Sequence, residues 1–158
     1  MYGGVVLKVR DIMSKKVVTI GADAPVVEAA RKMKDANIGS VVVLDKNAVA
    51  GIVTDRKIVM AVVAENRDPA KEKIGSITGK NLITCNEDSD VHDAAITMGK
   101  NKVRRCPVVN ERKELVGVIS MADIARDMKG CMDAMFDEIS KSSVGMGHAR
   151  EESRPVIR

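Results

Sequence analysis

The feature that most constrains the fold is an internal duplication of about half the chain. An offset of 65 residues aligns identical residues of the two halves: Ile12 with Ile77, Thr19 with Thr84, Asp23 with Asp88, Val26 with Val91, Ala29 with Ala94, Met33 with Met98 and Val43 with Val108. One inserted residue then shifts the offset to 66, which aligns Gly51 with Gly117 and Ile58 with Ile124. Two copies of this length are too few and too long for an open array of repeats. We therefore expect two half-domains packed against each other.

The first copy predicts the order β-α-β-β-α. Residues 17–20 are rich in β-branched side chains, which favour a strand. Residues 38–44 form a nearly continuous apolar run, typical of a strand covered on both faces, and residues 48–53 return as the second strand of a hairpin. Thr54 is expected to cap a helix that runs to about residue 64. The second copy repeats this order, with strands near 82–85, 103–109 and 115–120.

Each copy also predicts one amphipathic helix between its first two strands. Asp23 is the expected N-cap of the first, with Pro25 in its first turn, where the missing N–H costs nothing. The apolar face recurs at the spacing i, i+3, i+4, i+7: Val26, Ala29, Ala30 and Met33 in the first copy, and Val91, Ala94, Ala95 and Met98 in the second. Faces made of small residues and a Met predict close packing on a sheet.

These patterns predict an α/β (α+β) protein in which two β-α-β-β-α repeats pack pseudo-symmetrically as one module. The expected divisions are a lead-in 1–8, a first repeat 9–64, a charged linker 65–73, a second repeat 74–128, a C-terminal helix 129–140 and a tail 141–158. The C-terminal helix is expected to fold back on the core, with a dimer contact as the alternative, through Met132, Met135, Phe136 and Ile139. The tail has little apolar content and is expected to be disordered.

Composition narrows the class of partner. Tyr2 and Phe136 are the only aromatic residues, which disfavours stacking on the bases of single-stranded nucleic acid. The net charge of +4 suits an anionic partner, but the 26 basic and 22 acidic residues are interspersed rather than clustered. A small phosphate-bearing ligand asks for less positive charge than a duplex does, so nucleic acid is disfavoured as a partner.

The cysteines and the hydropathy pattern set further limits. Cys85, Cys106 and Cys131 have no CxxC spacing, so the sequence predicts neither a disulfide framework nor a zinc site, and no metal is expected. The sequence shows no signal-peptide pattern and no apolar run near the roughly 20 residues of a membrane span. We expect a cytoplasmic protein with no membrane contact.

Both copies end in a Gly-apolar-apolar-Thr/Ser-x-x-Asp-like sequence, and together they resemble the tandem domains named after cystathionine β-synthase, the CBS domains. The resemblance covers roughly residues 9–128. It also rests on Val-Arg-Asp-Ile-Met at 9–13, on residues 23–33 as the first helix, and on Arg-Arg-Cys-Pro-Val-Val at 104–109. Each motif alone is weak, whereas their combination with the repeat is specific.

The resemblance implies a regulatory module rather than an enzyme. Paired CBS domains enclose two clefts that commonly hold adenosyl ligands such as AMP, ADP, ATP or S-adenosylmethionine, and two pairs often join into a disk-shaped homodimer. No obligatory cofactor is implied.

Ser120 and Asp123 are the expected ribose-binding residues of the second copy. A carboxylate three residues after a helix cap can accept hydrogen bonds from two ribose hydroxyls, although Ser-x-x-acid is also a capping box. In the first copy Lys57 stands where the pattern has Asp, and Lys cannot accept hydrogen bonds from a diol. That site is either empty or binds ribose through Thr54 and Asp55.

Four basic residues are candidate phosphate ligands. Arg104 and Arg105 are adjacent on a strand, so one is expected to face the cleft and the other the surface, and the sequence does not say which. Arg56 and Lys57 lie near a helix N-terminus and either contact phosphate or form a solvated helix surface. Apolar candidates for an adenine slot are Leu82, Thr84, Val103, Pro107 and Ile119 in the second copy, with Val17, Thr19, Ile38 and Val53 as counterparts.

We therefore expect a non-catalytic, adenosyl-ligand-sensing module that controls a partner protein. The alternative is a nucleic-acid-binding or purely protein-interacting module without a nucleotide ligand. No Ser-His-Asp or Cys-His arrangement and no Walker-type loop can be assembled, which disfavours an enzyme.

Overall fold

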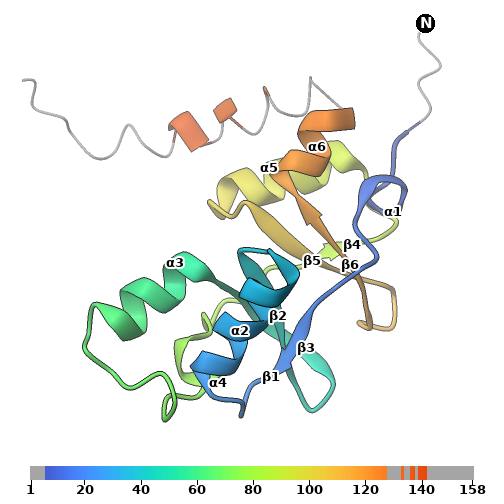
Figure 1. Ribbon diagram of the computed structural model, residues 1–158. Helices are drawn as coiled ribbons and strands as arrows, with labels where there is room; N and C mark the ends of the chain where they lie inside the picture. Colours follow the sequence, from blue (N-terminus) through green and yellow to red (C-terminus); the bar gives the residue numbers. More distant parts are fainter. Residues whose placement is uncertain (1–5, 128–132, 134–135, 138, 142–158) are drawn as a thin grey trace, which may run out of the picture.

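The computed structural model describes residues 6–127, 133, 136–137 and 139–141, and Figure 1 shows their arrangement. The first copy forms a three-stranded sheet in the order β1-β2-β3 from Thr19–Gly21, Ser40–Asp45 and Ala48–Thr54. The second copy repeats that order as β4-β5-β6 with Cys85–Asn86, Arg105–Val109 and Leu115–Ser120. In each sheet the first strand pairs parallel with the second, and the second pairs antiparallel with the third. The predicted two-repeat α/β fold is confirmed.

Short helices join and cover the two sheets (Figure 1). Among the described residues the helices are α1 (Val9–Ile12), α2 (Val26–Ala36), α3 (Asp55–Ile58), the π-helix η1 (Val59–Val63), α4 (Ile74–Ile77), α5 (Val91–Lys100) and α6 (Met121–Asp127). The helix expected after Thr54 thus divides into α3 and η1, because Ala64 donates its N–H to the carbonyl of Val59, five residues back. The Thr54 cap is confirmed, since its hydroxyl accepts the N–H of Lys57 at 3.2 Å.

The C-terminal ends of α2 and α5 have the same hydrogen-bonding pattern, and this pattern corrects the starts of the strands predicted at 38–44 and 103–109. Ile38 donates its N–H to the carbonyl of Met33, and Val103 donates to Met98 in the second copy. These residues therefore belong to the helix ends, and β2 and β5 begin two residues later, at Ser40 and Arg105. Apolar runs alone cannot separate a helix-closing residue from the first residue of a strand.

The expected cap of α2 is also wrong. The helix begins at Val26 with Pro25 in the N-cap position, and Asp23 lies too early to reach its first turn. Its carboxylate instead pairs with the ammonium group of Lys73 at 3.0 Å.

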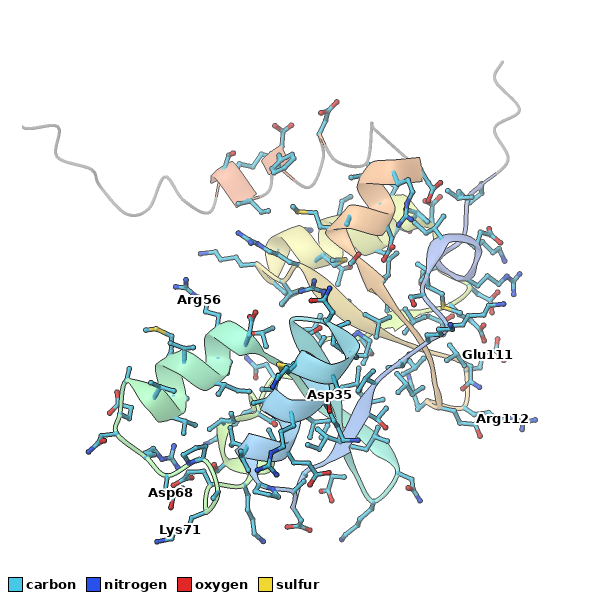
Figure 2. The ribbon with its side chains drawn as sticks, viewed as in Figure 1. Asp35, Arg56, Asp68, Lys71, Glu111 and Arg112 are labelled. Atoms are coloured by element: carbon cyan, nitrogen blue, oxygen red, sulfur yellow. The ribbon has the colours of Figure 1, made fainter. Side chains whose placement is uncertain are left out.

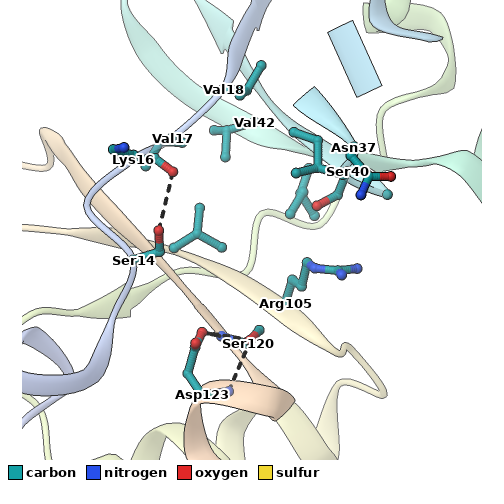
Figure 3. Close-up of a pocket in the computed structure, with 14 residues that line it drawn as sticks. Ser14, Lys16, Val17, Val18, Asn37, Ser40, Val42, Arg105, Ser120 and Asp123 are labelled. Carbon is teal, nitrogen blue, oxygen red and sulfur yellow. Dashed lines mark hydrogen bonds between the residues drawn. The ribbon is translucent and has the colours of Figure 1, made fainter. Parts of the chain in front are cut away.

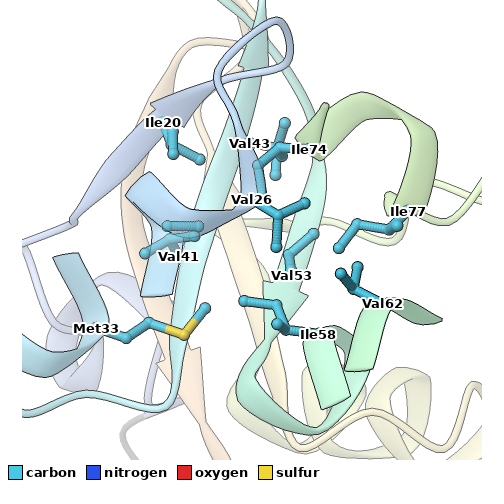
Figure 4. Close-up of a cluster of buried hydrophobic side chains, with 11 residues drawn as sticks. Ile20, Val26, Met33, Val41, Val43, Val53, Ile58, Val62, Ile74 and Ile77 are labelled. Carbon is cyan, nitrogen blue, oxygen red and sulfur yellow. The ribbon is translucent and has the colours of Figure 1, made fainter. Parts of the chain in front are cut away.

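The predicted apolar helix faces are buried, with one exception. In the second copy Val91, Ala94, Ala95 and Met98 are all buried. In the first copy Ala30 is exposed, because α2 turns that position toward solvent. Figure 4 shows the first-copy core, which comprises Ile20, Val26, Ala29, Met33, Val41, Val43, Val53, Ile58, Val62, Ile74 and Ile77.

The division between the two hydrophobic cores does not coincide with the linker between the repeats in the sequence. Ile74 and Ile77 on α4 lie in the first-copy core although they follow the linker in sequence. Conversely, Val9 on α1 is fully buried in the second-copy core, and its N–H bonds to the carbonyl of Ser89 at 2.9 Å. The first helix of each copy, α1 or α4, therefore packs in the core of the other copy. Burial of these apolar side chains stabilises both halves together.

A third cluster joins the two sheets. Val42 and Val49 from the first sheet pack with Val109 from the second, and partly buried Val17 and Val118 flank them. Ser14 and Val118 also exchange two backbone hydrogen bonds, at 2.9 and 3.0 Å. The segment at Ser14, which precedes β1, is thus hydrogen-bonded to β6 of the second copy.

Part of the predicted C-terminal helix is described. Asp133, Phe136, Asp137 and residues 139–141 are helical, and Ile139 packs against the second-copy core. Met132, Met135 and the expected tail beyond Lys141 lie outside the described residues.

Candidate functional site

The larger of two described pockets lies where the copies meet and has a volume of about 320 Å³. Figure 3 shows first-copy residues on one side and Ser120 with Asp123 opposite. The first copy contributes Ser14, Lys16, Val17, Val18, Asn37, Ile38, Gly39, Ser40, Val42 and Ile52, and the second contributes Arg105, Val118, Ser120 and Asp123. Because both copies form its walls, neither can build this site alone.

Ser120 and Asp123 bind each other at the start of α6. The Oδ2 of Asp123 accepts the backbone N–H of Ser120 at 2.8 Å and its hydroxyl at 2.6 Å. In return, the Ser120 Oγ accepts the N–H of Asp123 at 3.2 Å. The capping-box alternative is therefore realised. The same two residues also line the larger pocket.

The second carboxylate oxygen of Asp123 faces Arg126. Its Oδ1 accepts a guanidinium N–H at 2.7 Å, and the Asp123 side chain is 16% exposed against 68% for Arg126. An ion pair in which one partner is this exposed contributes little to stability, because water competes for the guanidinium group of Arg126. The Oδ1 atom is therefore paired with a more exposed partner than Oδ2 is.

The structure resolves which of the two adjacent arginines faces the pockets. Arg105 lines both described pockets and Arg104 lines neither. Arg105 pairs with Ser120 in the β5–β6 register, while the Arg104 carbonyl accepts the N–H of Met121 at 2.9 Å. Arg104 precedes β5, so of the two arginines only Arg105 projects from the strand beside Ser120.

The adenine candidates do not gather as expected. Val17 and Ile38 line the larger pocket, and Val103 lines the smaller one. Ile119 and Val53 are fully buried in the hydrophobic cores, where their side chains are unavailable to a ligand. Four others line neither described pocket: Thr19, Leu82, Thr84 and Pro107.

Ser120 and Asp123 do not share the larger pocket with the apolar candidates of their own copy. Their apolar wall comes mainly from the first copy, because the segment at Ser14 is bonded to Val118 on β6. For the same reason, Lys16, Asn37 and Ser40 were not predicted as site residues from the sequence. Their only signal was proximity to Val17 and Ile38.

The smaller pocket, of about 150 Å³, is the pseudo-symmetric counterpart of the larger one. The repeat offset relates Gly79 to Ser14, Asn81 to Lys16, Ile83 to Val18, Val103 to Ile38 and Arg105 to Ser40. Gly51 and Ile52 complete its lining.

The remaining first-copy candidates stand away from both described pockets. Thr54, Asp55, Arg56 and Lys57 line neither of them. Thr54 caps α3, and Asp55 accepts the N–H of Arg56 at 2.6 Å while its carboxylate lies against Gly39. Arg56 extends into solvent at the edge of the molecule (Figure 2).

The described residues contain no group of three His, Cys, Asp or Glu side chains placed to hold a metal ion. Their helices are all too short or too polar to cross a membrane.

A pseudo-symmetric pair of β-α-β-β-α repeats with a pocket at their junction defines the tandem-repeat ligand-binding modules. The model of the CBS domain matches residues 9–64 and 74–130, so this chain belongs to the CBS domain family. The resemblance drawn from sequence is confirmed.

Three similar proteins illustrate the family. A 17.7 kDa protein of Acidianus ambivalens is 34% identical over 141 residues, covering 89% of this chain and 84% of that protein. The crystal structure of hypoxic response protein I with two coordinated zinc ions is 29% identical with a TM-score of 0.71, covering 77% of this chain and 99% of that one. The CBS domain pair of protein MJ0100 in complex with methylthioadenosine and S-adenosyl-L-methionine is 32% identical with a TM-score of 0.70, covering 80% and 98%.

Proposed function

We propose that this CBS pair is a non-catalytic regulatory module that binds an adenosyl ligand in the larger pocket and thereby controls a partner protein. The observation that carries the proposal is the Ser120–Asp123 pair at the mouth of a pocket shared by both copies. The complex of the MJ0100 pair with two adenosyl compounds supports this ligand class.

Ribose binding is assigned to Asp123 and Ser120. Oδ2 of Asp123 is held by two hydrogen bonds, which fix the carboxylate in place. Oδ1 is bonded to the exposed Arg126 and becomes an acceptor for a ribose hydroxyl when that guanidinium swings into solvent. Charge-assisted hydrogen bonds of this kind are the stronger ones in proteins.

The adenine ring is assigned to the apolar wall opposite. Val17 and Ile38 lie there with Ile52 and Val118. Ile38 is 37% exposed although it is a large apolar residue, and burial under a planar ring would remove that surface from water.

Phosphate groups are assigned to Arg105 and Lys16. Both line the larger pocket, from the second and first copies respectively. A guanidinium group suits bidentate contact with phosphate oxygens, and an ammonium group adds a second positive charge. These cations favour AMP, ADP or ATP over the uncharged methylthioadenosine.

The regulatory step follows from the composite site. A ligand that touches Val17 on one copy and Asp123 on the other stabilises the arrangement in which the copies are close. It shifts the equilibrium only by its difference in affinity between the two arrangements. We further propose that two chains form a homodimer and that the protein acts in the cytoplasm on a protein target.

Titration calorimetry with AMP, ADP, ATP, S-adenosylmethionine and methylthioadenosine tests the proposal, alongside thermal unfolding with each compound. A ligand at about 100 times its dissociation constant adds about 2.7 kcal/mol of apparent stability. If none of the five binds or raises the melting temperature, the module has no adenosyl ligand. Ser120 and Asp123 would then be a helix cap only, as in a purely protein-interacting module.

A further inference from the structure

Two cysteine thiols meet inside the second copy. The Sγ atoms of Cys85 on β4 and Cys106 on β5 are 3.3 Å apart, and both residues are free cysteines. Cys85 is 5% exposed and Cys106 is completely buried. The spacing of the cysteines in the sequence predicts no disulfide framework, and the contact arises from the pairing of β4 with β5.

The duplication shows that the fold does not require sulfur at these positions. The repeat offset relates Cys85 to Ile20 and Cys106 to Val41, and both counterparts are buried in the first-copy core. Aliphatic side chains therefore satisfy the same packing in the sister sheet. The thiol pair adds a chemical property rather than a packing requirement.

The polar surroundings of the pair set different roles for the two thiols. The Cys106 sulfur lies 3.5 Å from the Ile83 carbonyl and 3.6 Å from the Pro107 carbonyl. The thiol–thiol hydrogen bond lowers the pKa of Cys85, against the opposing effect of burial, and raises the pKa of Cys106. Cys85 is thus the better nucleophile, because the thiolate is the reactive form.

We propose that Cys85 and Cys106 are a modification site at which hydrogen peroxide forms a reversible intramolecular disulfide. The Cys85 thiolate attacks the peroxide oxygen, the O–O bond breaks, and Cys85 becomes a sulfenic acid while water leaves after protonation. The Cys106 thiol then attacks the Cys85 sulfur, which releases a second water and forms the S–S bond. Two thiols lose two electrons and two protons, and one hydrogen peroxide is reduced to two waters.

Access to the pair is provided by the edge of the sheet. The strand β4 is two residues long, lies at the end of the order β4-β5-β6, and pairs with β5 only through Cys85 and Asn86. Short edge strands open locally at lower cost than central ones. A molecule as small as hydrogen peroxide needs only such an opening to reach Cys85.

Disulfide formation would act on the smaller pocket. Ile83 lies two residues before Cys85 and Arg105 directly precedes Cys106, and both line that pocket. Forming a bond of about 2.05 Å shortens the 3.3 Å separation of the two sulfur atoms by about 1.2 Å and joins the two segments covalently. The modification therefore ties together two walls of one pocket.

The test uses the Cys131→Ser protein, which leaves only the two thiols of interest. The protein is treated with hydrogen peroxide, quenched, unfolded and alkylated with iodoacetamide, and its mass is measured before and after dithiothreitol. The expected result is no alkyl groups after peroxide and two after reduction, with a peptide linking residues 85 and 106. Non-reducing electrophoresis should show a monomer.

Matched variants keep the test decisive. Cys106→Val places the first-copy residue at that position, and its folding is checked by circular dichroism, with Cys85→Val as the alternative. With no resolving thiol, Cys106→Val should trap a sulfenic acid on Cys85 that reacts with dimedone. Two alkylatable thiols after peroxide, an irreversible sulfinic acid at Cys85, or a disulfide between chains would each overturn the proposal.

Discussion

Arg105 and Ser120 face each other across the antiparallel strands β5 and β6, and both line the larger pocket. Paired residues in such a register project to the same face of the sheet. The cation proposed for phosphate and the hydroxyl proposed for ribose are therefore held at a fixed spacing by the backbone. Arg104, one residue earlier, lines neither described pocket and supplies a matched control.

Replacing Arg105 with Gln should weaken AMP, ADP and ATP binding by about fivefold, since an exposed cation is screened by water. Binding of methylthioadenosine, which has no phosphate, should not change. Arg104→Gln should leave all four affinities as they are. Titration calorimetry measures each, and equal effects of the two substitutions would contradict the assignment.

Replacing Asp123 with Ala should affect both stability and binding. Loss of the two bonds that Ser120 donates to the Asp123 carboxylate should lower the free energy of unfolding by about 0.5–2 kcal/mol, the usual cost of losing a helix cap. Loss of the ribose acceptor should reduce adenosyl-ligand affinity by about tenfold or more. Urea unfolding and calorimetry well below the melting temperature separate these effects.

Asp127→Ala removes an exposed carboxylate from the same helix and is the control. It should change stability by less than about 0.5 kcal/mol and leave binding intact. A binding loss equal to that of Asp123→Ala would point to the charge of α6 rather than to the ribose contact.

The binding stoichiometry should be one ligand per chain. The smaller pocket has about 150 Å³ against about 320 Å³ for the larger, and Lys57 stands where the second copy has Asp123. The smaller pocket therefore lacks the volume that an adenosine needs and the carboxylate that would accept hydrogen bonds from its ribose diol. Calorimetry with protein of known active fraction gives this number, and two equivalent sites would show that Lys57 does not disable the first-copy site.

Local patterns predicted the elements because their causes are local. The spacing of Val91, Ala94 and Met98 specified a helix face, and the hairpin of β5 and β6 followed from two apolar runs separated by a turn. Because the sequence is duplicated, each pattern occurs twice, and each copy supports the prediction made for the other. The same reasoning placed Ser120 and Asp123 together correctly, since they are one helical turn apart.

The sequence could not predict which residues face them. The exchange of α1 and α4 between the cores, and the bonding of Ser14 to Val118, depend on how two complete halves pack. Ala30 shows the limit within one helix, because it repeats Ala95 in sequence but is exposed. Helices can pack differently on two sheets that have the same strand order. The spacing of apolar residues along each helix does not reveal that difference.

Gly117 should tolerate a side chain less well than Gly51, its counterpart. A Cβ at Gly117 would lie 2.5 Å from the Met13 sulfur and 2.9 Å from the Ser14 carbonyl oxygen, whereas a Cβ at Gly51 meets only the Thr78 methyl group at 2.7 Å. Gly117→Ala must displace backbone that lines the larger pocket, so it should cost about 1–3 kcal/mol and weaken ligand binding. Gly51→Ala should cost less and leave that binding unchanged, as urea unfolding and calorimetry would show.

Ala95 and Ala30 offer the sharpest test of how the two copies differ in packing. Both lie inside a helix at equivalent repeat positions, so replacement by Leu has the same small cost in helix propensity at each. Ala95 is completely buried in the second-copy core, where three extra carbons force neighbouring side chains apart, and Ala95→Leu should cost about 1–3 kcal/mol. Ala30→Leu adds the same atoms to an exposed surface and should change the free energy of unfolding by less than about 0.5 kcal/mol. Urea unfolding of the two variants measures this difference directly, and equal destabilisation would mean that Ala30 is buried in solution by a contact outside the single chain.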